Sequence, residues 1–395
     1  MEKIELLSPA GDLEKLKIAY LYGADACYIG GKDFSLRANA TNFSIKEIKE
    51  AKEIAKKLNK KLYVTVNIVF HNEDLEGIED YLKQLEEIEI DGIILSDPML
   101  IPIIKEKYKK IKIFISTQNS TTNTLAVKYW LEQGADRVVL SRETTKEEIK
   151  EIYDETKADL EVFLHGAMCT CISGRCVLSN YFTNRDSNRG GCAQVCRFNF
   201  DLDKKRDIDF TIATKDLNLA RNIPDLIEIG VKSLKIEGRM RSAYYLATLN
   251  NCYRTLIDAY YNNEFNEQLL ERELKLLDRV ANRDTSSQYF KHQADETDQY
   301  YNGREERSNQ DFLGIVLSYN KKTKIATIEQ RNYFKKDETI NIFGPNGIDF
   351  DYKVYKIYDE EFNELDCARH PKQIIKMKID KEITKDCMLR KSIWA

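Results

Sequence analysis

The sequence contains no long hydrophobic run. Nowhere do about eighteen apolar residues follow one another, the length that a membrane-spanning helix needs. The first residues, MEKIELLSPAG, also lack the basic start and apolar core of a signal peptide. These absences argue against a membrane-spanning or exported protein, and we expect a cytoplasmic protein without a membrane partner.

Several motifs of catalysis and phosphate binding are absent too. The chain has no H-E-x-x-H and no G-x-S-x-G, which disfavours zinc peptidases and serine hydrolases. It has neither G-x-G-x-x-G nor G-x-x-x-x-G-K-[ST], so a dinucleotide site or a P-loop loses its main support. A net charge of −4 argues against a uniformly basic nucleic-acid coat, although a local basic patch stays open. The histidines are few: His71, His165, His292 and His370.

The chain is long enough for one large and one small domain. Its 395 residues, 42% hydrophobic and 32% charged, provide packed cores and a soluble surface. Up to about residue 241, β-rich runs alternate with amphipathic stretches of helical length, which is typical of a parallel sheet with crossover helices. The runs are IELL, ACYIG, KLYVTVN, DGIILS, IKIFIS, RVVLS, LEVFLH and SLKIEG.

Eight such runs predict an α/β fold, a TIM-like (β/α)8 barrel, with an open doubly wound sheet as the alternative. The segments YGADACYIG, QGADRVVLS and IGVKSLKIEG each place a glycine between a helical stretch and a strand, where a left-handed cap is useful. In barrels of this kind the active site lies at the carboxyl ends of the strands. We therefore expect the functional residues there.

The domain boundaries follow from changes in composition. We expect a barrel over residues 1–280, with an insertion at about residues 166–207 that is too long for an ordinary connection. Residues 281–311 are mostly polar and are interpreted as a linker. From residue 312 short β-type runs alternate with turn residues, which predicts a small all-β domain, a β-barrel, over residues 312–395.

The insertion carries five of the nine cysteines. Cys169 and Cys176 enclose six residues, fifteen residues separate Cys176 from Cys192, and three separate Cys192 from Cys196. In a reducing cytosol clustered thiols indicate metal or redox chemistry more often than disulfides. The spacing fits an iron-sulfur cluster, and a zinc site or unligated thiols stay open. Cys171 is the ambiguous fifth thiol, and the four cysteines outside the insertion are expected to be buried core residues.

The stretch EVFLHGAMCTCISGRCVLS resembles the signature of peptidase family U32, read as E-x-F-x-x-G-A-x-C-x-x-x-x-G-x-C-x-x-S. Further similar segments are LLSPAGDLEKLKIAYLYGADACYIGG, NYFTNRDSNRGGCAQVCR and SLKIEGRMRSAYY, and the likeness spans nearly the whole chain. The fixed signature positions are filled by Glu161, Phe163, Gly166, Ala167, Cys169, Gly174, Cys176 and Ser179.

This resemblance implies a 4Fe-4S cluster held by Cys169, Cys176, Cys192 and Cys196. Some relatives take one ligand from the last barrel strand, but GVKSLKIEG has no cysteine, which favours Cys196 as the fourth. With one barrel and one β domain, the chain looks most like members that hydroxylate the wobble uridine of tRNA without oxygen, with prephenate as the small-molecule hydroxyl donor. A collagenase-like peptidase is the alternative, as is an accessory protein that needs a redox or subunit partner.

Candidate site residues follow from position and chemical type. His165 and Glu237 stand at strand ends and are candidates for proton transfer or substrate hydrogen bonding. Carboxylates of the donor need cations, for which the candidates are Arg37, Arg142, Lys235 and Arg239. Candidates for RNA contact in the insertion are Arg185, Arg189 and Arg197, interleaved with aromatic residues that could stack a base. Each also has an ordinary structural role as its alternative.

Overall fold

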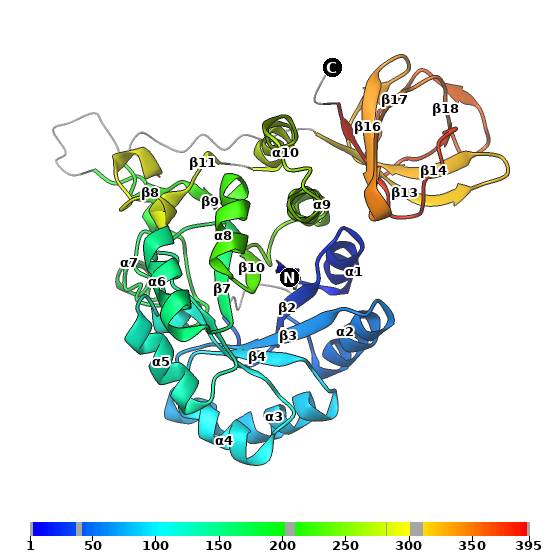
Figure 1. The fold of residues 1–395 in the computed structure, drawn as a ribbon. Coiled ribbons are helices and arrows are strands. Elements are labelled where there is room, and N and C mark those ends of the chain that lie inside the picture. Colours follow the sequence, from blue (N-terminus) through cyan, green and yellow to red (C-terminus); the bar gives the residue numbers. More distant parts are fainter. Residues whose placement is uncertain (1–2, 37–41, 202–209, 282, 301–310, 393–395) are drawn as a thin grey trace.

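A computed structural model describes residues 3–36, 42–201, 210–281, 283–300 and 311–392 (Figure 1). Its core is a closed ring of eight parallel strands, because β10 pairs with both β1 and β7. The barrel predicted from the sequence is confirmed, and all eight expected strands form. They are β1 (Glu5–Pro9), β2 (Ala26–Gly30), β3 (Lys61–Val66), β4 (Gly92–Leu95), β5 (Ile113–Ile115), β6 (Arg137–Val139), β7 (Leu160–Gly166) and β10 (Ser233–Ile236).

Helices surround the ring and bury its outer face (Figure 1). The glycine joints expected from the sequence are present, since Gly23, Gly134 and Gly230 have φ of 114°, 100° and 102°, the left-handed region that glycine adopts without strain. No helix in the described ranges is long and apolar enough to span a membrane. The helices are α1 (Leu13–Leu21), α2 (Ile45–Lys57), α3 (Ile78–Glu87), α4 (Leu100–Lys107), α5 (Thr124–Gln133), α6 (Lys146–Thr156), α8 (Ile223–Ile229), α9 (Ala243–Tyr261) and α10 (Glu267–Val280).

The amino end of the barrel interior is closed by paired charges. Glu5 Oε1 accepts from Arg137 Nη1 at 2.6 Å, and its Oε2 accepts from the Tyr63 hydroxyl at 2.7 Å. Glu161 also lies 3.2 Å from Arg137 Nη1 and accepts from Lys235 Nζ at 2.7 Å. All of these side chains are buried. A buried ionic network with every charge paired belongs to the stability of the barrel.

The insertion leaves the barrel at the end of β7 and contains α7 (Leu178–Thr183). It returns through β8 (Ala213–Thr214) and β9 (Asp216–Asn218), and β9 pairs antiparallel with the end of β7. The segment interpreted as a linker also contributes here, because β11 (Thr285–Ser286) pairs with β9 and β12 (Gln299–Tyr300) pairs with β8. The described part of this segment therefore packs on the barrel rim instead of crossing freely to the second domain.

The C-terminal domain is all β and antiparallel. Eight strands form one curled sheet, β15 pairs with β20, and no pairing of described residues joins the edge strands β17 and β19. The expected β domain is thus confirmed as antiparallel sheets. Its strands are β13 (Phe312–Asn320), β14 (Ile325–Gln330), β15 (Phe334–Lys335), β16 (Thr339–Gly344), β17 (Ile348–Lys353), β18 (Ile357–Tyr358), β19 (Glu364–Leu365), β20 (Cys367–Ala368), β21 (Ile374–Lys378) and β22 (Met388–Lys391).

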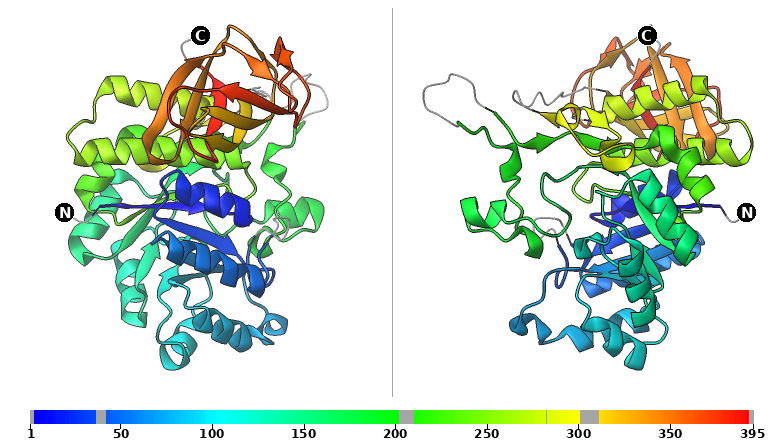
Figure 2. Two further views of the ribbon diagram at one scale, coloured as in Figure 1. Left: turned by 90° about the vertical axis from the view of Figure 1, so that its right-hand side faces the viewer. Right: turned by 60° about the vertical axis from the view of Figure 1, so that its left-hand side comes forward.

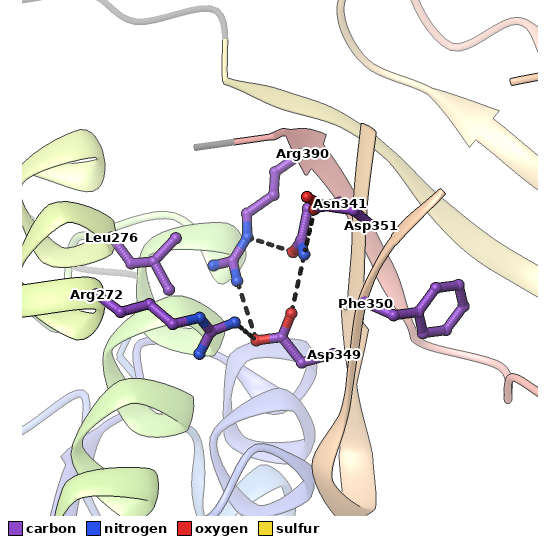
Figure 3. Close-up of a pocket in the computed structure, with 7 residues that line it drawn as sticks. All are labelled: Arg272, Leu276, Asn341, Asp349, Phe350, Asp351 and Arg390. Atoms are coloured by element: carbon purple, nitrogen blue, oxygen red, sulfur yellow. Dashed lines mark hydrogen bonds and ion pairs between the residues drawn. The ribbon is translucent and has the colours of Figure 1, made fainter. Parts of the chain in front are cut away.

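This domain is seated on the last barrel helices, on the side away from the insertion (Figures 1 and 2). Tyr244 of α9 stacks on Phe312 with ring centroids 4.6 Å apart. A polar cavity of about 190 Å³ lies between α10 and the domain (Figure 3). In it Asp349 pairs with Arg272 of α10 at 2.5 Å and with the buried Arg390 at 3.5 Å. Stacked rings and shared charges therefore fix the two domains together.

Candidate active site at the carboxyl end of the barrel

One anchor holds the cysteine loop against the loops that follow β5 and β6. Glu143 Oε1 accepts hydrogen bonds from the N–H and the hydroxyl of Ser173, at 3.1 and 3.2 Å. Arg175 Nε donates to Ser120 Oγ at 3.2 Å. The loop between the second and third thiols of the insertion is thus fixed at the carboxyl end of the barrel.

A second anchor holds the insertion to the loop after β3, on the opposite side of the ring from β7. Val69, in the loop after β3, donates its N–H to the carbonyl of Asn188 at 3.2 Å. Arg189 donates to the carbonyl of Val69 at 2.7 Å and to Asp74 at 2.9 Å. Since β3 and β7 are four places apart in the eight-strand ring, the insertion extends across the mouth of the barrel.

Two signature glycines explain how the loop approaches so closely. At Gly174, with φ +77°, an added Cβ would lie 2.1 Å from the carbonyl oxygen of Gln118. At Gly166, with φ +123°, an added Cβ would lie 2.8 Å from Cβ of Glu237. Any side chain at either position would push the loop away from the strand ends. The signature therefore encodes the fit of the loop to the barrel.

The five insertion thiols gather in this loop. Cys169 is exposed and Cys171, Cys176, Cys192 and Cys196 are half-buried, whereas the four cysteines outside the insertion are buried, as expected. Cys171 hydrogen-bonds to Cys176, and Cys196 lies within electrostatic reach of Cys169 and Cys192. No three of these sulfur atoms lie within 4.8 Å of one another in the described chain. Among the described residues these sulfur atoms are therefore not close enough together to hold one metal ion as they stand.

The thiols differ in acidity. Burial raises the pKa of Cys171 to about 12, and its hydrogen bond with Cys176 adds to the rise. Burial also raises the pKa of Cys196. For Cys176 burial opposes ionisation, but the polar groups of Ser187 and Ser179 beside the thiol hold its pKa below its ordinary value. This direction favours the thiolate of Cys176, the form that ligates metals.

The predicted anion-binding cations have different environments. The Arg142 guanidinium lies over the ring of Phe163, 3.7 Å from its centroid, and no carboxylate of the described residues pairs with it. Lys235 is paired with Glu161, and burial lowers its pKa although this pairing opposes the shift. Arg239 is buried and donates to Ser35 Oγ at 3.0 Å and to the carbonyl of Leu36. Arg37 lies outside the described residues.

The two residues predicted for proton transfer adjoin one another at the ends of β7 and β10. The Glu237 N–H donates to the His165 carbonyl at 2.8 Å, and the Glu237 side chain is half-buried. The His165 side chain is only 1% exposed and is hydrogen-bonded to Tyr253 of α9. Burial, with Arg241 nearby, lowers the pKa of His165 to about 3. The imidazole of His165 is thus bonded through Nδ1 to a tyrosine and not to a cysteine.

The arginines predicted for RNA contact separate into two groups. Arg185 is exposed and has no carboxylate partner among the described residues, and Arg197 donates to Gln194 at 2.9 Å. Arg189 is instead occupied by Asp74 and serves as an anchor of the insertion. The apolar side chains around them are exposed: Ile172 56%, Val177 68%, Tyr181 82%, Phe182 53% and Phe198 47%.

Several site residues escaped the sequence analysis. Glu143 receives the cysteine loop, while Tyr253 and Asn218 surround His165. Glu143 directly follows Arg142 at a strand end, and that position was the available signal. Tyr253 stands in the middle of a helix 88 residues after His165, where no local pattern distinguishes it from a core tyrosine.

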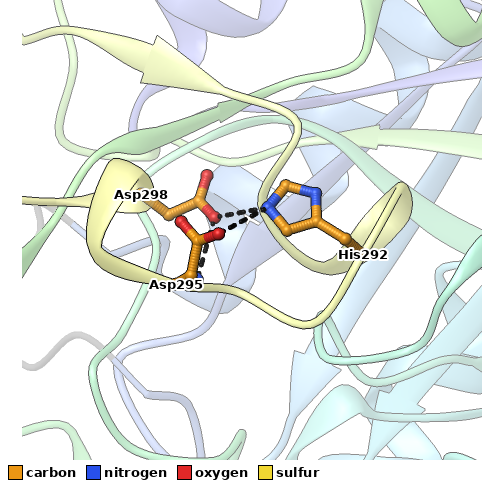
Figure 4. A group of neighbouring side chains, drawn as sticks. All are labelled: His292, Asp295 and Asp298. Carbon is orange, nitrogen blue, oxygen red and sulfur yellow. Dashed lines mark hydrogen bonds and ion pairs between the residues drawn. The ribbon is translucent and has the colours of Figure 1, made fainter.

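A separate group of possible metal ligands lies on the rim segment. His292 Nε2 is 3.2 Å from Asp298 and 3.7 Å from Asp295 (Figure 4). His292 and Asp295 are exposed, and Asp298 accepts from the N–H of Asp295 at 3.2 Å. Contacts among these three side chains within one short turn account for the arrangement, so we assign no metal to it.

Comparison with known proteins identifies the family. The model of peptidase family U32 matches residues 11–300, and that of the U32 C-terminal domain matches residues 308–390. The chain belongs to peptidase family U32. The resemblance seen in the cysteine signature is confirmed, and it extends over both domains.

Members of the family with assigned names are similar along most of the chain. The tRNA hydroxylation protein P1 of Bacillus subtilis is 47% identical over 99% of this chain and 95% of its own length. The tRNA hydroxylation protein P of Escherichia coli is 32% identical, over 88% of this chain and 87% of its own. A collagenase of Porphyromonas gingivalis is 32% identical over 72% of this chain and 73% of its own. Family U32 thus includes relatives named for two different activities.

Proposed function

We propose that this protein is a tRNA-modification enzyme that replaces the C5 hydrogen of the wobble uridine by a hydroxyl group. The relatives named as tRNA hydroxylation proteins support RNA hydroxylation, since one of them matches nearly the full chain. The observation that carries the proposal is structural. A loop of five thiols is fixed at the barrel mouth by Glu143, the residue that follows Arg142, a cation without a carboxylate partner among the described residues.

The thiols fit a 4Fe-4S cluster better than a single zinc ion. Four thiolates at about 2.3 Å from one zinc ion would bring their sulfur atoms to about 3.8 Å from each other. No three sulfurs of the insertion lie within 4.8 Å of one another, whereas a cluster has a wider cage. In this proposal Cys169, Cys176, Cys192 and Cys196 are the ligands, with Cys171 as a neighbour. The cluster would supply single-electron transfer or Lewis acidity.

Arg142 is the residue we assign to the hydroxyl donor, proposed to be prephenate. Stacking on Phe163 holds the guanidinium plane while leaving its edge N–H groups free of carboxylate partners in the described chain. A bidentate carboxylate fits such an edge. Lys235 already has its charge balanced by Glu161 in the buried network of the barrel interior, so we do not assign it to the dianion.

For tRNA we assign the exposed face of the insertion. Tyr181 and Phe182, edge to face at 5.1 Å, together with Phe198, offer rings on which unstacked bases of a single-stranded loop can lie. Arg185 and Arg197 supply the charge for nearby phosphates. Proteins that recognise RNA by sequence mostly bind its single-stranded loops, and the wobble base lies in such a loop of tRNA.

The decisive test measures 5-hydroxyuridine in tRNA. Deleting the gene should remove the nucleoside from digested tRNA, and restoring the wild-type gene should recover it, as read by mass spectrometry. Cells blocked in prephenate synthesis should also lose it. Unchanged 5-hydroxyuridine after deletion, in a strain without a second copy, would refute the proposal.

Peptidase activity is the second candidate, because one relative is named a collagenase. The buried His165, bonded to Tyr253 and not to a cysteine, weighs against a thiol peptidase here. Purified zinc-free protein that cleaves gelatin would favour this candidate. Brown, anaerobically purified protein that leaves gelatin intact would favour hydroxylation.

A further inference from the structure

The end of β7 holds a chain of hydrogen bonds that the proposed function has not used. His165 Nδ1 lies 2.8 Å from the hydroxyl of Tyr253, and this hydroxyl lies 3.3 Å from Oδ1 of Asn218. His165 and Tyr253 are buried, at 1% and 0% exposure. The three residues come from β7, α9 and β9. The chain therefore connects the barrel wall to the returning strand of the insertion.

The direction of the protons in this chain can be deduced. Asn218 Oδ1 also accepts the backbone N–H of Ala220 at 3.0 Å, which identifies that atom as the amide oxygen. An amide oxygen only accepts, so the Tyr253 hydroxyl must give it its one proton. The phenol oxygen can then only accept from His165, so Nδ1 of the imidazole carries the hydrogen. His165 Nε2 is left with a lone pair.

The surroundings keep the imidazole neutral. Arg241 and Glu237 are the charged groups that act on the ring, and burial together with Arg241 lowers the pKa of His165. Glu237 belongs to the carboxyl end of β10, where the active site of a barrel is found. No hydrogen bond from the described residues reaches Nε2. A bare nitrogen at this position can accept a hydrogen bond from a bound molecule.

We propose that His165 Nε2 accepts a hydrogen bond from a hydroxyl or imide N–H of a bound substrate, and that Tyr253 and Asn218 are positioning residues that fix its tautomer. The inference rests on the proposed hydroxylation, whose two substrates each offer such a donor. These are the hydroxyl of the small-molecule donor and N3–H of the uracil. The Michaelis constants for the two substrates distinguish them.

The tautomer can be measured without any activity assay. In protein labelled with ¹⁵N-histidine, correlation spectra resolve the four histidines, and His165→Asn identifies the signal of His165. We expect a protonated Nδ1 and a bare Nε2 that stay unchanged between about pH 5.5 and 8. In Tyr253→Phe the tautomer should be lost or mixed. A wild-type Nε2–H tautomer, or titration near the usual histidine pKa, would overturn the proposal and leave the hydroxylation proposal standing.

A kinetic experiment compares two replacements of His165. Asn places its amide N–H near the position of Nδ1 and so keeps the bond to Tyr253, but offers no acceptor at the position of Nε2. Gln reaches the position of Nε2 with an amide oxygen. At equal iron content, His165→Asn should lower the hydroxylation rate by at least about tenfold and His165→Gln by less. If His165→Asn raises the Michaelis constant for tRNA, the hydrogen-bond donor to Nε2 is the uracil. If it raises the Michaelis constant for the small molecule, the donor is the hydroxyl of that molecule.

Full activity of His165→Asn would overturn the acceptor role. Should this variant fail to fold, the spectrum of Tyr253→Phe still decides the tautomer. Should wild-type protein form no 5-hydroxyuridine while the tautomer is as deduced, the proposed function fails and the positioning chain remains.

Discussion

Charged side chains have different kinds of partner at the two ends of the barrel. At the amino end, Arg137 is shared between Glu5 and Glu161, and Glu161 also binds Lys235, so that each buried charge has a partner. At the carboxyl end, Arg142 lies on Phe163 without a carboxylate from the described residues, and the next residue, Glu143, binds the thiol loop.

The difference separates stability from function. A buried charge whose partners all belong to the protein has no capacity left for a ligand, and removing one partner destabilises the fold. A cation held by an aromatic ring keeps its donors available. Changes at the two ends should therefore have opposite effects on folding and on activity, and the following experiments test this.

The largest effect is expected from the thiols. Cys196→Ser should abolish the iron content and the absorbance near about 400 nm after anaerobic purification, and with them 5-hydroxyuridine in complemented cells. Cys171→Ser is the matched control and should keep nearly all the iron. The reverse pattern would mean that Cys171, and not Cys196, is the fourth ligand.

Arginine replacements test the two ends directly. Arg137→Ala, at the amino end, leaves Glu5 and Glu161 buried without their partner and should lower the free energy of unfolding by about 3–5 kcal/mol, measured by urea titration. Arg142→Ala should change it by less than about 0.5 kcal/mol.

In the activity assay we expect the larger effect from Arg142→Ala and the smaller one from Arg137→Ala. Arg142→Ala should raise the Michaelis constant for the small-molecule donor about 10- to 100-fold, the loss of a charge-assisted hydrogen bond worth about 1.5–3 kcal/mol. If Arg142→Ala instead unfolded the protein and left this constant unchanged, the two ends would not differ as proposed.

A pair of glycines tests the fit of the thiol loop. Gly174 and Gly347 have nearly equal φ, +77° and +76°, but an added Cβ meets the Gln118 carbonyl at 2.1 Å only at Gly174. Both alanine variants should lose about 1–2 kcal/mol of stability from the left-handed backbone. Only Gly174→Ala should also lose iron binding. Equal iron content in both variants would mean that the close approach is not needed.

The amino end should also show a pH dependence. Burial alone would raise the pKa of Glu5, but Arg137 and Lys61 hold it below its usual value. The resulting stability is complete above the unfolded pKa of about 4.3 and is lost as the pH falls through the lower folded pKa. Between about pH 6 and 3, the urea midpoint should therefore fall more steeply in wild type than in Glu5→Gln. If the urea midpoints of wild type and Glu5→Gln fell in parallel with pH, Glu5 would not be the source of the pH dependence.

The smallest effect is expected at the RNA-facing surface. Arg185→Ala should weaken tRNA binding a few-fold and reduce the slope of log affinity against log salt by about 0.7–1, the contribution of one phosphate contact. Arg189→Ala should mainly loosen the insertion, because Asp74 already binds this arginine. Fluorescence anisotropy at several salt concentrations measures both, and equal salt slopes for the two variants would contradict the assignment.

Much of the fold could be predicted because its signals are local. The eight strands, the glycine joints and the all-β domain each depend on patterns within a few residues. The rim segment 281–311 was less well anticipated, since β11 and β12 are two residues each and form only because the insertion offers edges to pair with. For the site, the signature identified the thiol loop and its glycines, but not the residues that receive them.

The sequence by itself determined where chemistry would be found: a barrel, a rim insertion and a set of thiols with the spacing of a known family. Only the tertiary structure decided which charges remain available. Lys235, Arg189 and Arg142 are equally basic in the sequence, yet Lys235 and Arg189 are paired with carboxylates, whereas Arg142 has no carboxylate partner among the described residues. Pairing depends on distances between side chains that are tens to hundreds of residues apart, and those distances exist only once the ring of strands has closed.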